Sequence, residues 1–89
     1  MFSVTYTRTF LRHFRMLPTA TQVKVDELVD LLTVDFRDSR LHSKKLNLSI
    51  AIYSFRAGRD YRVLFRFSDG ATIELLDVRH RKDIYRSLK

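Results

Sequence analysis

The chain of 89 residues contains no cysteine, one proline and two glycines. Without cysteine, neither a disulfide scaffold nor a thiolate metal site can form, which points to the reducing cytoplasm. The scarcity of proline and glycine leaves little room for linkers, so we expect residues 1–89 to fold as a single domain. No apolar run reaches the ~20 residues that a membrane helix needs, and the N-terminus alternates like a strand rather than a signal peptide. The sequence therefore predicts a compact cytoplasmic protein without a membrane partner.

Positive charge is abundant and unevenly distributed. The net charge is +7, from 17 Lys and Arg against 10 Asp and Glu. Residues 37–66 hold eight Lys or Arg against two Asp, and residues 79–89 hold five against one Asp, whereas residues 24–35 hold four acids and one Lys. The positive field thus belongs to the second half of the chain. It indicates a polyanionic partner, either nucleic acid or an acidic protein segment.

The N-terminal part predicts a strand followed by a short helix. Residues 2–6 alternate apolar and polar side chains, as a half-buried strand does. Thr7 or Thr9 can cap the short helix, and Pro18 ends it. Its apolar face is Phe10, Leu11, Phe14 and Leu17. His13 lies in this helix between Arg12 and Arg15, and we interpret it as a surface histidine.

A longer helix and a basic loop come next. Thr19 and Gln22 have the spacing of a capping box, and an apolar stripe follows at Val25, Leu28, Val29 and Leu32. The segment 35–49 has no clean period, so we interpret it as a loop. This loop carries His42, Lys44 and Lys45, which either contact an RNA backbone or are simply solvated.

The register of the next hairpin follows from its side-chain faces. A three-residue loop, Gly58-Arg59-Asp60, sets Phe55 opposite Val63 and gives one continuous apolar face. The same register sets Arg56 opposite Arg62, with Arg66 further along that face. Directly opposed like charges destabilise a sheet, so an anion is expected to compensate them.

An internal compensation is the alternative for Arg62. Asp69-Gly70 is a strong two-residue turn, and that turn would place Asp77 opposite Arg62 as an ordinary ion pair. Together these elements predict an α+β fold, in which an antiparallel sheet has two N-terminal helices packed on one face. The expected order is β-α-α-β-β-β with a short C-terminal helical tail.

The last strand ends in a cluster of polar side chains. Arg79, His80, Arg81, Lys82 and Tyr85 follow the apolar run directly. Fixed positive charge can hold a phosphodiester, and an imidazole that titrates near neutral pH can move a proton. The alternative is a solvated basic C-terminus.

Three segments carry a resemblance to a known family. They are Tyr53-Ser-Phe-Arg56, Asp60-Tyr-Arg-Val-Leu-Phe65 and Leu75-Leu-Asp-Val-Arg-His-Arg-Lys-Asp-Ile-Tyr85. With the order of elements, they are similar to the RelE/ParE superfamily of bacterial toxins. The resemblance implies one of two activities, RelE-like cleavage of messenger RNA on the ribosome or ParE-like inhibition of DNA gyrase. It also implies a cognate antitoxin as partner.

The RelE-like branch is the one that the residues favour. By resemblance, Arg56 and Arg62 match basic positions on two strands, Arg81 a basic catalytic position and Tyr85 an aromatic one, while His80 resembles a histidine used by other ribonucleases of the superfamily. Ser54 occupies a position where some members of the superfamily have Lys, and this difference supports the alternative of gyrase inhibition. A third hypothesis is an inactive basic RNA-binding relative.

The chemistry assigns a role to each of these groups. Cleavage through the 2′-hydroxyl needs a base, positive charge at the phosphorane and an acid, with no metal or other cofactor. Arg56, Arg62 and Arg81 suit only the charge role, because arginine stays protonated. We predict His80 as base and Tyr85 as acid or stacking ring. The predicted RNA-binding residues are Lys44, Lys45, Arg66, Arg79 and Lys82.

Overall fold

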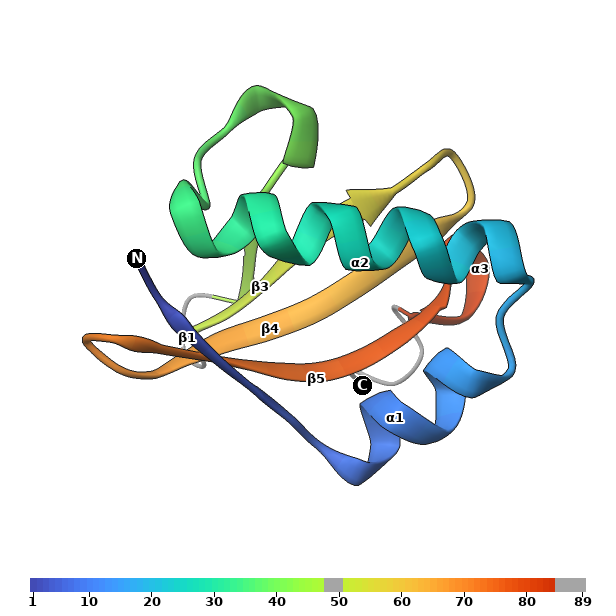
Figure 1. Ribbon diagram of the computed structural model, residues 1–89, viewed down its shortest axis with the longest axis horizontal. Coiled ribbons are helices and arrows are strands. Elements are labelled where there is room, and N and C mark those ends of the chain that lie inside the picture. Colours follow the sequence, from blue (N-terminus) through green and yellow to red (C-terminus); the bar gives the residue numbers. More distant parts are fainter. Residues whose placement is uncertain (48–50, 85–89) are drawn as a thin grey trace.

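A five-stranded sheet with helices across one face is the frame of the molecule (Figure 1). The computed structural model describes residues 1–47 and 51–84. In chain order the elements are β1 (Ser3–Tyr6), α1 (Arg8–Arg15), α2 (Thr19–Val34), the 3-10 helix η1 (Ser39–Leu41), β2 (Lys44–Asn47), β3 (Ile52–Ala57), β4 (Tyr61–Asp69), β5 (Thr72–His80) and α3 (Arg81–Ile84). The predicted α+β class is confirmed.

The strand order is β1-β5-β4-β3-β2. The antiparallel pairs β3-β4 and β4-β5 are as predicted. The strand β2, which was not predicted, also pairs with β3 antiparallel, and β1 pairs with β5 in parallel rather than antiparallel. The interpretation of residues 35–49 as a loop is wrong in part, because this segment contains η1 and β2. Four residues, two of them Lys, give no readable strand pattern. They become a strand because their backbone hydrogen-bonds along the free edge of β3, with Lys44 opposite Ser54 and Lys45 opposite Tyr53.

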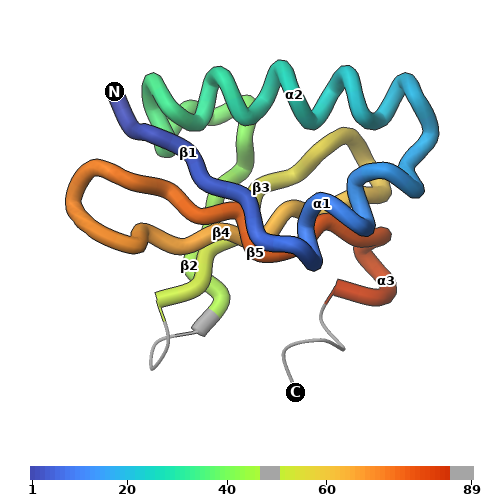
Figure 2. Tube along the Cα trace, turned by 60° about the horizontal axis from the view of Figure 1, so that its bottom comes forward, coloured from blue at the N-terminus to red at the C-terminus, as the bar shows by residue number. Residues whose placement is uncertain are grey.

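The core lies between the sheet and the two long helices. Phe55, Val63 and Phe65 from the sheet are fully buried against residues of both helices, among them Phe10 of α1 and Val25 of α2. In Figure 2, α2 lies above the sheet, and α3 lies at the lower right, directly after the end of β5. The predicted stripe of α2 is buried throughout, but Leu11 of α1 is exposed.

Two capping predictions have different outcomes. Thr7 is the N-cap of α1, since its hydroxyl oxygen accepts from the Phe10 N–H at 3.1 Å. The capping box predicted for α2 is wrong, because Pro18 occupies the N-cap position and Gln22 Nε2 instead donates to the Leu17 carbonyl at 3.0 Å.

The hairpin register is confirmed. Phe55 lies opposite Val63 and Arg56 opposite Arg62, across a loop of three residues in which Gly58 has a φ of 72°. The predicted partner of Arg62 is wrong. Asp69 pairs with Thr72, and a bulge leaves Leu76 unpaired, so that Asp77 lies opposite Leu64. The Thr7 hydroxyl sits at this bulge, 3.0 and 2.9 Å from the Leu75 and Leu76 carbonyl oxygens.

Candidate functional site

Three arginines form a row across the sheet, which we call the arginine row. Arg56 of β3 lies opposite Arg62 of β4, which lies opposite Arg79 of β5. Neighbouring strands are ~4.8 Å apart. Because the flanking residues Val63 and Val78 are buried in the core, the alternation of side chains turns the arginine row to the sheet face opposite α2.

The charge of the arginine row is only partly compensated. Arg79 Nε lies 3.1 Å from Asp77 Oδ2. Within residues 1–47 and 51–84, neither Arg56 nor Arg62 has a carboxylate at ion-pair distance. Arg62 instead donates from Nη1 to the carbonyls of Arg59 and Tyr61, at 3.2 and 3.0 Å. The row therefore keeps an excess of positive charge that an anion can neutralise.

A small basic cavity lies beside the row. Its volume is about 50 Å³, and it is lined by His42, Lys44, Ser54, Arg56 and Arg62. His42 follows η1 with a φ of 48°, in the left-handed region that non-glycine residues rarely adopt. Asp38 holds this turn, because its carboxylate accepts from the backbone and side chain of Arg40, and these bonds lower the pKa of Asp38 to about 2. No pattern in the sequence indicates that His42 lies beside these arginines.

A larger cavity, which we call the β5-end cavity, has a volume of about 360 Å³. It is bounded by the end of α1, the start of β4, the end of β5 and α3. Its polar lining residues are His13, Tyr61, Arg79, His80 and Asp83, and its apolar lining residues are Met16, Leu17 and Val78. A volume at the lower end of the range for ligand pockets, with apolar walls and a few polar groups, suits a small planar ligand.

His80 is anchored on the wall of the β5-end cavity. Its ring meets the ring of Tyr61 edge to face, with centroids 5.7 Å apart. The Lys82 backbone N–H donates to His80 Nδ1 at 3.2 Å. Since Nδ1 accepts this bond, the neutral ring carries its proton on Nε2. In this conformation His80 offers a hydrogen-bond donor.

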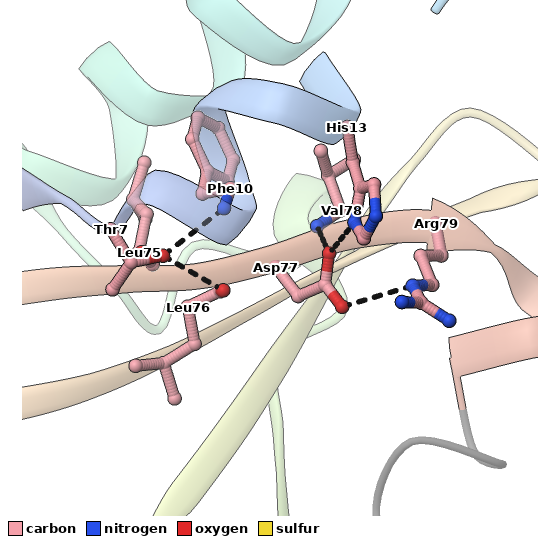
Figure 3. A network of polar contacts seen from close by, with 8 residues as sticks. All are labelled: Thr7, Phe10, His13, Leu75, Leu76, Asp77, Val78 and Arg79. Atoms are coloured by element: carbon pink, nitrogen blue, oxygen red, sulfur yellow. Dashed lines mark hydrogen bonds and ion pairs between the residues drawn. The ribbon is translucent and has the colours of Figure 1, made fainter. Parts of the chain in front are cut away.

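His13 is half-buried and belongs to a polar network with Asp77 (Figure 3), so its interpretation as a surface histidine is wrong. His13 Nδ1 lies 2.6 Å from Asp77 Oδ1, which also accepts from the Val78 N–H at 2.8 Å. Asp77 is only 6% exposed. One pattern in the sequence could have predicted that His13 faces the sheet. His13 lies three residues after Phe10 and four before Leu17, on the same helical stripe.

The predicted site residues fall into separate groups. Arg56, Arg62, Arg79 and Lys44 lie together on the face opposite α2. Arg66 lies on that face too, but its Nε donates to Glu74 Oε1 at 2.7 Å. Lys45 is on the other face, opposite Tyr53.

The C-terminal residues divide in the same way. His80 shares the helix-covered face with Tyr61, so the sheet does not bring it to the side chains of Arg56 and Arg62. Arg81 and Lys82 are exposed in α3, and Tyr85 lies outside the described residues. Arg79 is the one predicted residue that belongs to the arginine row and also lines the β5-end cavity.

Among the described residues, no three His, Cys, Asp or Glu side chains are grouped to hold a metal ion. None of the described helices has the length and apolar character to cross a membrane.

Comparison with protein families gives the class that this fold and site define. Residues 4–85 match the family model of the ParE toxin of type II toxin-antitoxin systems. The chain therefore belongs to this toxin family, within the RelE/ParE superfamily. No curated protein matches the chain significantly.

Solved structures of toxins share the fold. The toxin-antitoxin complex RelBE2 from Mycobacterium tuberculosis is 30% identical, with a TM-score of 0.73 over 90% of this chain and 98% of that one. The archaeal RelE-RelB complex from Pyrococcus horikoshii OT3 is 23% identical, with a TM-score of 0.75 over 90% and 94%. The YoeB/ParE toxin from Agrobacterium tumefaciens is 15% identical, with a TM-score of 0.75 over 89% and 98%.

Proposed function

We propose that this toxin is an endoribonuclease that cleaves messenger RNA on the ribosome and so inhibits translation. The observation that carries the proposal is the position of Arg79. It ends a row of three arginines across the sheet and also lines a cavity that contains His80. A positively charged track that leads into a pocket with titratable groups suits a single-stranded polyanion that is held along its backbone and cut at one phosphate.

The proposed catalytic residues are Arg56, Arg62, His80, Arg81 and Tyr85. Arg56 and Arg62 hold the RNA backbone, and Arg81 offsets the charge that develops on the phosphorane, because guanidinium groups stay protonated and bind phosphate in a bidentate fashion. His80 acts at the phosphate through Nε2, and Tyr85 donates a proton or stacks on a base. The proposed RNA-binding residues are Lys44, Lys45, Arg66, Arg79 and Lys82. The ion pair of Arg66 with Glu74 weakens the contribution of Arg66 to RNA binding.

We propose a cognate antitoxin as the protein partner, by analogy with the RelBE2 and RelE-RelB complexes. A segment that carries carboxylates is the expected covering for Arg56 and Arg62, which lack carboxylate partners among the described residues. Inhibition would then be competitive with RNA.

A second candidate function is inhibition of DNA gyrase. The family model that matches residues 4–85 is the ParE model, which favours this candidate. A gyrase inhibitor acts by binding, so it would need the basic surface but no proton transfer.

The two functions are separated by paired assays on the same protein. Primer extension on a message in a translating extract reports cleavage, and supercoiling of a relaxed plasmid reports gyrase activity. The proposal predicts cuts in phase with codons and unchanged supercoiling. Intact message with inhibited supercoiling would contradict it and support the second candidate.

A further inference from the structure

The pair of His13 and Asp77 fixes which nitrogen of His13 carries a proton. An ionised carboxylate only accepts hydrogen bonds, so Nδ1 at 2.6 Å from Asp77 Oδ1 must be the protonated nitrogen. Asp77 is kept as an acceptor by the Val78 N–H and by Arg79. The neutral His13 ring therefore has its lone pair on Nε2, which has no partner among the described residues. A carboxylate that orients an imidazole in this way also stabilises the imidazolium once it forms.

The β5-end cavity is lined by two histidines with complementary hydrogen-bonding groups. His13 comes from α1 and offers a proton acceptor, while His80 comes from the end of β5 and offers the Nε2 proton. Tyr61 adds an aromatic ring to the lining and Arg79 a positive charge. Among the described residues, Asp83 is the acid that lines the cavity, and Arg79 offsets its repulsion of a phosphate.

We propose that the β5-end cavity binds one nucleotide of the RNA, and that His13 is the catalytic base, with Asp77 as its positioning residue. This inference rests on the proposed function. His13 Nε2 takes the proton of the 2′-hydroxyl, O2′ bonds to phosphorus, and the bond from phosphorus to O5′ breaks. O5′ takes a proton from water, and the hydroxide left behind recovers the proton from His13. His80 Nε2–H donates to a non-bridging phosphate oxygen.

A purely structural role for the pair has different consequences. The contact joins α1 to β5 across 64 residues of sequence, so it also contributes to stability. Two variants separate the roles. His13→Gln keeps an N–H for Asp77 but has no basic nitrogen, and Arg12→Gln is the matched control on the exposed side of the same helix.

The decisive measurement is the single-turnover rate of message cleavage on purified ribosomes between pH 5.5 and 8.5, with thermal melts of each protein. We expect the wild-type rate to rise with pH across this range, because a general base acts only in its deprotonated form. His13→Gln should lose at least ~100-fold and this pH dependence, while it keeps its melting temperature within a few degrees. Arg12→Gln should behave as wild type.

Asp77 and chemical rescue give independent readouts. Asp77→Asn should slow cleavage in the folded protein, because an amide N–H can donate to Nδ1 of His13 and then leaves the proton of the neutral ring on Nε2. In His13→Ala, added imidazole should restore cleavage as its neutral form accumulates, which a structural role does not predict.

The outcomes are distinguishable. If a folded His13→Gln protein cleaves with the same rate and pH profile as the wild type, the proposed role of His13 is wrong, and the ribonuclease proposal remains intact. Absence of cleavage by the wild type would refute the ribonuclease proposal itself, and the role of His13 with it.

Discussion

Arg56 and Arg62 lie directly opposite each other on β3 and β4, and no carboxylate among the described residues pairs with either. Like charges in this arrangement destabilise a sheet by ~0.2–1 kcal/mol. A stability cost concentrated at one place on a basic surface is typical of a binding site, where the ligand removes the repulsion.

Arg56→Gln is therefore expected to stabilise the free protein while it weakens cleavage. Relief of the repulsion should raise the melting temperature by up to ~5 °C for a chain of this size. Arg66→Gln is the matched control, because Arg66 is already paired with Glu74 and should gain nothing. A melting temperature that falls in Arg56→Gln would show that Arg56 is held by favourable contacts instead.

The loop between β3 and β4 depends on one glycine. Gly58 has a φ of 72°, and nothing lies within 4 Å of a Cβ added there, so Gly58→Ala tests backbone conformation without a steric clash. The left-handed conformation should cost the variant ~1–2 kcal/mol in denaturant unfolding. Gly70→Ala also meets nothing within 4 Å and lies outside the positive-φ region, so it should be neutral or slightly stabilising. Equal effects of the two substitutions would contradict this account.

Acid should loosen the turn that carries His42. The bonds from Arg40 lower the pKa of Asp38 from 3.8 to about 2. A lowered pKa in the folded state stabilises the protein above the unfolded value, and this contribution is lost as the pH falls from about 4 through about 2. Asp38→Asn should thus melt below the wild type at pH 6, and the difference should close by pH 2. A difference that is the same at both pH values would exclude the carboxylate charge as its cause.

Two substitutions at the end of β5 test the proposed catalytic residues. His80→Ala and Arg81→Ala should each reduce message cleavage by ~100-fold or more, because they remove a donor or a positive charge at the phosphate. Arg81 is exposed and His80 lies beyond the core, so both variants should remain folded. Thermal melts provide the check. Full cleavage by a folded His80→Ala protein would contradict the proposed role of His80 as a hydrogen-bond donor to the phosphate.

The sequence predicted the register of β3 and β4 because side-chain alternation in both strands allowed one loop length only. It could not predict β2, whose four residues are a strand only through their backbone bonds to β3. It also misplaced Asp77. The local preference of Asp69-Gly70 for a turn is weaker than the burial of Ile73, Leu75 and Val78, which the bulge at Leu76 makes possible together.

The candidate site was predictable only where it lies in one segment. The pairing of Arg56 with Arg62 followed from the hairpin, but the position of Arg79 opposite Arg62 did not, because it depends on the bulge at Leu76. The pair of His13 and Asp77 did not, because a contact across 64 residues has no local pattern. The sequence correctly placed His80 at the end of β5. The face of the sheet on which His80 lies could not be predicted, because it depends on the bulge at Leu76, four residues earlier.

A pair of messages tests whether the β5 end cleaves RNA through the 2′-hydroxyl. A cut site is first mapped with the wild-type toxin on ribosomes, and a second message then carries a single 2′-deoxynucleotide on the 5′ side of that cut. We predict that the first message yields a 2′,3′-cyclic phosphate and a 5′-hydroxyl end, and that the second stays intact at the mapped position. Cleavage of the deoxy-substituted message at that position, or no cleavage of either, would contradict the account.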